Sequence, residues 1–150
     1  MKRPEILAPA GNFEKMKAAI AATFYNKENG LFRASADNNI YTVLGCAFAM
    51  LIGLGDGRTL KAIKGECEEE LVPATLSMLP YAYDVILAHD KEGGRDFVLK
   101  DIREKYSYML SKDATSFWET IEGESAFHDA GSLCHGWSAI PVYYFKKLIR

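Results

Sequence analysis

The apolar positions of this chain follow the spacing of α-helices over most of its length. Four of them between residues 95 and 110 fall on one helical stripe: Val98, Ile102, Tyr106 and Met109. This pattern predicts an amphipathic surface helix over that segment. Residues 40–54 are apolar on nearly all sides, which predicts a helix that is buried all round.

Four further helices are predicted from helix-forming residues and from the signals that begin or end a helix. They cover residues 13–24, 59–67, 80–89 and 138–148. Asn12 is a good N-cap for the first of them. Pro80 suits the first turn of the third, with Ser77 or a neighbour as its cap. Residues 26–38 and 111–136 are expected to be loops, because they are polar, rich in small residues and without periodicity.

The six predicted helices give an all-α fold without an internal sequence repeat. Buried and amphipathic helices alternate along the chain, as they do in a double-layered helical toroid with apolar inner helices and amphipathic outer ones. A plain helical bundle is the alternative architecture, and the pattern alone favours the bundle.

The composition argues against several classes of function. The 150 residues carry a formal net charge of -2, so no basic surface for nucleic acid is expected. The apolar stretch 40–54 is shorter than the roughly 20 residues of a membrane helix, and the first residues lack the apolar run of a signal peptide. Cys46, Cys67 and Cys134 do not make a disulfide framework, which favours a reducing compartment. The expectation is a soluble cytoplasmic protein without a membrane or nucleic-acid partner.

Two motifs carry the candidate chemistry. Ala114–Glu119 sets a carboxylate beside a tryptophan, and Ser132–Ser138 holds a histidine and a second tryptophan in a turn of small residues. An aromatic face packs on the C–H face of a sugar, a carboxylate activates water, and an imidazole donates to a ring substituent. Together these groups are typical of a carbohydrate site.

These motifs resemble the C-terminal part of the catalytic domain in α-L-rhamnosidases and neighbouring (α/α)6-barrel glycosidases. In that family a Thr-Thr-x-Trp-Glu motif carries the catalytic base, and a Ser-Leu-x-His motif lines the same pocket. The resemblance extends over residues 23–148 and implies a partial (α/α)6 toroid. It also implies that Glu119 deprotonates water in an inverting hydrolysis of α-L-rhamnosides or related plant glycosides.

Substrate-binding roles follow from the same resemblance. His135 is expected to bind a sugar hydroxyl or the reaction centre, the alternative being a histidine bonded within its own loop. Trp137 and Trp118 are expected to form a stacking wall, although structural support is the favoured role for Trp118. Tyr41 and Asn39 lie at the start of the all-apolar segment, where the pocket loops of such a barrel are found.

The chain departs from the family in its size. A complete barrel needs about twelve helices and about six are predicted here, so the half that supplies the general acid is missing, as is the β-sandwich that often follows. The expected partners are a carbohydrate and either a complementing N-terminal half or further copies of this chain. A non-catalytic carbohydrate-binding or structural helical domain is the alternative function.

A second resemblance covers only the start of the chain. Residues 2–17 are similar to the opening strand, turn and helix of the collagenase-like peptidase family, with Glu5–Ala8 as the strand. Nothing after residue 20 continues this likeness. The chain is therefore divided into an N-terminal segment, residues 1–20, and a helical domain, residues 21–150, and a peptidase-related protein is a third hypothesis.

The sequence offers little support for other chemistry. His128, Asp129, Cys134 and His135 lack the spacing of a standard metal site, so no metal is expected. Cys134 beside His135 is not a protease dyad, because adjacent residues in an extended turn point apart. Residues 53–57 are rich in glycine but lack the pattern of a phosphate-binding loop, and no cofactor is expected.

Overall fold

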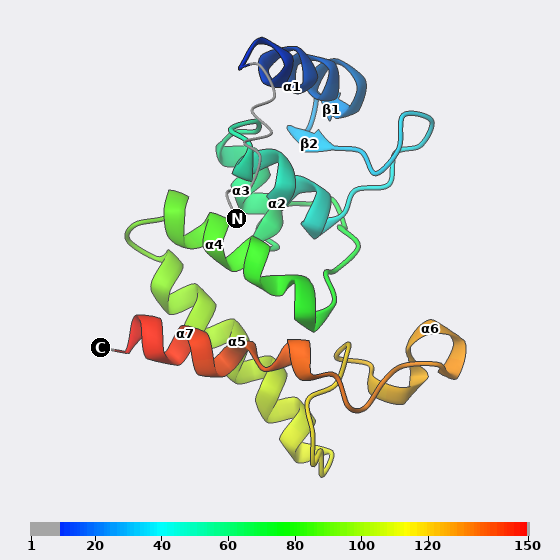
Figure 1. Cartoon of the computed structure of the whole chain (residues 1–150), viewed down its shortest axis with the longest axis vertical. Helices are drawn as coiled ribbons and strands as arrows, with labels where there is room; N and C mark the ends of the chain where they lie inside the picture. Colours follow the sequence, from blue (N-terminus) through cyan, green and yellow to red (C-terminus); the bar gives the residue numbers. More distant parts are fainter. Residues whose placement is uncertain (1–9, 150) are drawn as a thin grey trace, which may run out of the picture.

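The chain folds into helices joined by irregular loops (Figure 1). The computed structural model describes residues 10–149. Seven α-helices lie in this range: α1 (Ala10–Phe24), α2 (Val43–Leu51), α3 (Gly57–Ile63), α4 (Leu79–His89), α5 (Gly94–Ser111), α6 (Ala126–Asp129) and α7 (Ile140–Leu148). Three 3₁₀ turns lie between them: η1 (Leu76–Met78), η2 (Gly123–Ser125) and η3 (Gly136–Ser138). Over the same residues the only strands, β1 (Tyr25–Asn26) and β2 (Leu31–Phe32), form a short antiparallel hairpin, so the predicted all-α class is confirmed.

α4 lies between α2 and α3 on one side and α5 and α7 on the other (Figure 1). α2 packs on α4 and α3 packs against both, while α5 packs on α4 and on α7. α4 and α7 also meet, since the ring centroids of Tyr83 and Tyr144 lie 5.2 Å apart, edge to face. The Tyr144 hydroxyl donates to the carbonyl of Pro80 at 3.0 Å. α4 therefore contacts α2, α3, α5 and α7.

The hydrophobic core extends from β2 and α2 through α4 and α5 to α7. Val85 on α4 and Val98 and Ile102 on α5 are fully buried. Met109 is also buried and Tyr106 is half-buried, so the stripe predicted for this helix is confirmed. Each such aliphatic side chain stabilises the fold by about 1.5–3 kcal/mol relative to leaving it in water.

α2 is shorter and less buried than the sequence predicts. It begins after Thr42, whose hydroxyl caps it by accepting from the N–H of Gly45 at 2.9 Å. Cys46 is fully buried, but Phe48 and Leu51 are 43% and 48% exposed. The prediction of a helix buried all round is therefore wrong, because no element within residues 10–149 covers this face of α2 completely.

Other boundaries differ from the predicted ones in smaller ways. α1 begins at Ala10 rather than near residue 13. Pro80 lies in the first turn of α4 as predicted, but neither Ser77 nor a neighbouring side chain caps that helix. The expected loop 26–38 contains β2 and the end of β1. The strand suggested for Glu5–Ala8 lies outside the described residues.

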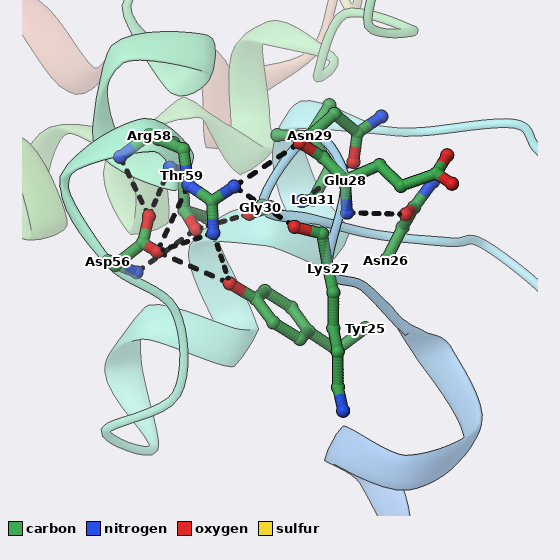
Figure 2. Close-up of polar contacts among 10 residues, drawn as sticks. All are labelled: Tyr25, Asn26, Lys27, Glu28, Asn29, Gly30, Leu31, Asp56, Arg58 and Thr59. Atoms are coloured by element: carbon green, nitrogen blue, oxygen red, sulfur yellow. Dashed lines mark hydrogen bonds and ion pairs between the residues drawn. The ribbon is translucent and has the colours of Figure 1, made fainter.

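Arg58 fastens the β-hairpin to the start of α3 (Figure 2). All five of its N–H groups have partners. The carboxylate of Asp56 accepts from Nε at 3.3 Å and Nη2 at 3.0 Å, and the Tyr25 hydroxyl accepts from Nη2 at 2.9 Å. The carbonyls of Lys27 and Glu28 accept from Nη1 at 3.1 and 3.3 Å. Because no donor is left for a ligand, this cluster positions the hairpin rather than forming a binding site.

The hairpin turn approaches α3 closely at Gly30. The buried hydroxyl of Thr59 donates to the Gly30 carbonyl at 2.6 Å. A Cβ on Gly30 would lie 2.8 Å from Nε of Arg58, and its φ of +78° favours glycine. The close approach and the backbone conformation therefore both require glycine at this turn.

Cys46, Cys67 and Cys134 are all free thiols. Burial raises the pKa of Cys46 and of Cys67, which keeps both as unreactive thiols at neutral pH. None of the helices within residues 10–149 is both long and apolar enough to cross a membrane.

Candidate functional site

The two sequence motifs lie side by side, joined through their backbones. The N–H of Glu119 donates to the carbonyl of Ser132 at 2.9 Å. The N–H of His135 donates to the carbonyl of Phe117 at 2.6 Å. The pairing runs in opposite directions along the two segments, so the Trp-Glu motif and the His-Gly-Trp motif form one local structure.

One further contact joins the two motifs, and another holds Glu119 from the opposite side. The hydroxyl of Ser116 donates to the carbonyl of Leu133. On the other side, the N–H of Leu76 donates to the carbonyl of Glu119 at 3.0 Å, and Leu76 is 1% exposed. Both backbone polar groups of Glu119 are therefore bonded, and its half-buried side chain extends from a fixed backbone.

His135 lies at the start of η3, in the next turn of the same structure. Its carbonyl accepts from the N–H of Ser138 at 3.0 Å, and the Tyr106 hydroxyl donates to the carbonyl of Ser138. Burial, with a smaller effect from the Asp101 carboxylate, raises the pKa of Tyr106, so this phenol stays protonated at neutral pH. Among the described residues the His135 ring makes no hydrogen bond, which leaves its nitrogens available to a ligand.

The two tryptophans of the motifs differ in their surroundings. Trp118 is half-buried, and its ring lies so close to Gly123 that a Cβ there would come within 2.9 Å of Cε3. Trp137 is 78% exposed. Trp118 therefore supports the loop that follows Glu119, while Trp137 offers a free aromatic face.

Tyr41 and Asn39 belong to the hairpin region rather than to the paired motifs. Tyr41 is 8% exposed, and its hydroxyl accepts from the side-chain amide of Asn26 at 2.8 Å. Its carbonyl accepts from the N–H of Val72 at 2.9 Å. Asn39 is exposed. In the described part of the chain, no hydrogen bond links either residue to Glu119 or its neighbours.

The loop that follows Glu119 is closely packed and strained. A Cβ on Gly131 would lie 1.9 Å from the carbonyl oxygen of Gly123, so the two backbones touch. Three successive residues have left-handed backbones: Phe127, His128 and Asp129, with φ of 55°, 60° and 65°. Such residues cost of order 1–2 kcal/mol each and persist only where their surroundings hold them.

Acidic side chains gather on the outside of this loop. Glu122, Glu124 and Asp129 line an open depression of about 500 Å³ with Trp118 and Lys112. Glu122 and Glu124 are exposed, as expected for solvated loop charges. Across residues 10–149, no three His, Cys, Asp or Glu side chains lie close enough together to hold a metal ion.

The residue that the sequence did not suggest is Leu76. Its N–H holds the carbonyl of Glu119 although the two lie far apart in the chain. No short motif marks Leu76, because only its backbone N–H is used. The paired segments carry one half-buried carboxylate, one imidazole without a hydrogen bond among the described residues and one exposed indole, the kinds of group that bind a hydroxylated ring and activate a water molecule.

Comparison with known proteins supports a particular fold. No family model and no curated protein matches the chain. Two solved structures do. One is the rhamnosidase from Klebsiella oxytoca with rhamnose bound, at 17% identity and a TM-score of 0.69, covering 89% of this chain and 27% of that one. The other is the GH78 family rhamnosidase of Bacillus sp. GL1, at 25% identity and a TM-score of 0.69, covering 89% of this chain and 15% of that one.

The chain thus spans about a quarter or less of the rhamnosidases that it resembles. Its helices are part of an α/α toroid, as predicted, and not a plain bundle. The comparisons give no support to the likeness between residues 2–17 and the collagenase-like peptidases. The fold of residues 10–149 is therefore that of a partial α/α toroid similar to the one in GH78 rhamnosidases.

Proposed function

We propose that this chain is a glycoside hydrolase-like domain that acts on α-L-rhamnosides or related glycosides, with Glu119 as the catalytic base. The observation that carries the proposal is the pairing of the two motifs. Backbone hydrogen bonds from Glu119 to Ser132 and from His135 to Phe117 place a carboxylate and an imidazole on adjacent segments of a partial toroid. The fold of the Klebsiella oxytoca and Bacillus rhamnosidases supports the same activity.

In the proposed reaction Glu119 takes a proton from water while the water oxygen bonds to the anomeric carbon. The bond from that carbon to the glycosidic oxygen breaks, and a general acid protonates the leaving oxygen. His135 binds a sugar hydroxyl, and Trp137 packs on the C–H face of the ring. The general acid comes from a complementing part of the toroid, since the chain spans only a fraction of the rhamnosidases. Without it, hydrolysis is slowed by about 10²–10⁴-fold.

One observation favours a second candidate, a carbohydrate-binding domain without catalysis. Trp137 is the most exposed large hydrophobic residue in the described part of the chain, at 78%, and an exposed indole suits sugar binding whether or not a general acid is present. Both candidates use the same surface and differ in the role of Glu119.

A hydrolysis assay separates the two. The full chain is first tested alone on an aryl α-L-rhamnoside. It is then mixed with toroid helices of the Klebsiella oxytoca rhamnosidase from which the segment that matches this chain has been removed. Activity that requires the added helices and is lost in Glu119→Gln supports catalysis. Rhamnose binding that needs Trp137 but never leads to turnover supports the binding domain.

A further inference from the structure

A separate pocket of about 320 Å³ lies beside the loop that follows Glu119. Its walls come from the segment before η1, from α5 and from residues 120–127, and we call it the Lys105–Phe127 pocket. The apolar part of the wall includes Pro73, Ala74, Leu76, Ile121 and Ala126. Neither Glu119 nor His135 lines it, so it is distinct from the site proposed above.

Two charged groups of opposite sign face this pocket. The ammonium of Lys105 pairs with the Asp101 carboxylate, which leaves two of its three donors free. The side chain of Lys105 is 31% exposed. The carboxylate of Glu122 has no partner among the described residues. The pocket wall therefore holds a positively charged donor and a negatively charged acceptor. An ion of either sign would be repelled by one of them, whereas the hydroxyls of a neutral ligand can accept from the ammonium and donate to the carboxylate.

Thr120 adds an unsatisfied hydroxyl to the wall. The residue is 7% exposed, and Oγ1 is buried without a hydrogen-bond partner among the described residues. An unpaired buried hydroxyl is costly, so it favours any arrangement that supplies a partner. Because Thr120 lines the pocket, a ligand hydroxyl that enters it is a candidate partner for Oγ1 once a change of χ1 rotamer turns the hydroxyl toward the cavity.

Phe127 supplies an aromatic wall at a structural cost. Its ring is 55% exposed although it lines the pocket, and its backbone is left-handed, with a φ of 55°. A phenylalanine rarely adopts this conformation, and such strain is concentrated at functional sites. An exposed aromatic ring beside hydroxyl-binding groups matches the mixed faces of a sugar or another ring polyol.

We propose that the Lys105–Phe127 pocket binds a neutral, polyhydroxylated ligand about the size of one sugar ring. Its hydroxyls bond to Lys105, Glu122 and Thr120, and its C–H face packs on Phe127. The volume of about 320 Å³ lies at the lower end of the usual range for small-molecule sites, about 300–1,000 Å³. The inference does not depend on Glu119.

Amide chemical shifts of the full chain, titrated with L-rhamnose and separately with myo-inositol, test this proposal. We expect saturable shifts at Thr120 and Phe127 with at least one of the two ligands. Phe127→Asn keeps a residue that tolerates the left-handed backbone but removes the ring, and it should weaken binding about fivefold or more. Thr120→Val keeps the shape and removes the hydroxyl, and it should also weaken binding.

Two matched controls make the test decisive. Phe13→Ala removes a similarly exposed ring, 44% exposed on α1, and should leave the titration unchanged. Trp137→Ala removes the indole of the site proposed above, so it should also leave the shifts at Phe127 unchanged if the two sites are distinct. The proposal is overturned if neither ligand gives saturable shifts at these residues up to about 100 mM, far above the millimolar range of weak sites. Equal binding by Phe127→Asn and the parent protein would overturn it as well.

Discussion

The backbone N–H of Glu119 donates to the carbonyl of Ser132 at 2.9 Å. This bond joins the motif that carries the carboxylate to the motif that carries His135. A glutamate in an irregular loop would otherwise be free to sample many positions, and catalysis by a general base needs a fixed one.

Ser116 is expected to hold this pairing together, because its hydroxyl donates to the carbonyl of Leu133. Ser116→Ala should lower stability by about 0.5–1.5 kcal/mol and speed amide exchange at Glu119 and His135. Ser111→Ala is the matched control, since the Ser111 hydroxyl also donates to a backbone carbonyl, that of Tyr108 at 2.7 Å. Unchanged exchange at both amides in Ser116→Ala would show that the hydroxyl does not fix the pairing.

Gly131 is expected to be indispensable to the loop that follows Glu119. A Cβ at this position would lie 1.9 Å from the Gly123 carbonyl oxygen, so Gly131→Ala must push two backbone segments apart. We expect a loss of about 1–3 kcal/mol or more in the free energy of unfolding. Gly136→Ala is the control, because nothing lies within 4 Å of a Cβ there. Similar denaturation midpoints for both variants would contradict the packing described for this loop.

Asp56 is expected to make the hairpin sensitive to acid. The hydrogen bond from Arg58 holds the pKa of Asp56 below its usual value, with backbone donors adding to the effect. The folded pKa is therefore below the unfolded pKa of about 3.9. The stabilisation is fully present above the unfolded pKa and is lost as the pH falls through the folded pKa.

Thermal unfolding between pH 6 and pH 2 measures this contribution. Asp56→Asn should reduce the loss of stability in the acid part of that range. Asp113→Asn, in an exposed turn with a left-handed backbone that asparagine tolerates, should retain the full acid dependence. If both variants follow the parent protein at every pH, the Arg58 contact does not stabilise the hairpin.

The exposed apolar side chains predict self-association. Val142 and Phe145 are 68% and 38% exposed on α7, and Phe48 and Leu51 are exposed on α2. Light scattering should show a mass that rises with protein concentration, and Val142→Glu should reduce the rise because it places a charge on an apolar surface. Lys146→Glu alters the charge of the same helix without removing an apolar side chain and serves as the control. A monomer at every concentration would contradict this prediction.

The parts of the fold that follow from local spacing were predictable. The buried stripe of α5, with Val98 and Ile102, needs only a helical period. The position of Pro80 in the first turn of α4 needs only the missing N–H of proline. The exposure of Phe48 was not predictable, because the period of an all-apolar helix does not tell which side its neighbours cover.

The candidate site was predictable only in its residue types. Glu119 and His135 stand out through their motifs, but their pairing depends on backbone groups. The N–H of Leu76, which holds the carbonyl of Glu119, belongs to a residue with no chemical signature. Tyr41 is expected in a pocket loop because of its place at the start of the apolar segment. Instead it is buried, and its hydroxyl accepts from the side-chain amide of Asn26.

The initial rate of aryl α-L-rhamnoside hydrolysis by the complemented chain tests the central claim most directly. Glu119→Gln keeps the shape of the side chain but cannot take a proton from water, so the rate should fall by about 10²–10⁴-fold while rhamnose binding persists. Glu122→Gln and Glu124→Gln, which change exposed carboxylates in the following loop, should leave the rate nearly unchanged. Equal losses in all three variants, or full turnover in Glu119→Gln, would contradict the assignment of Glu119 as the catalytic base.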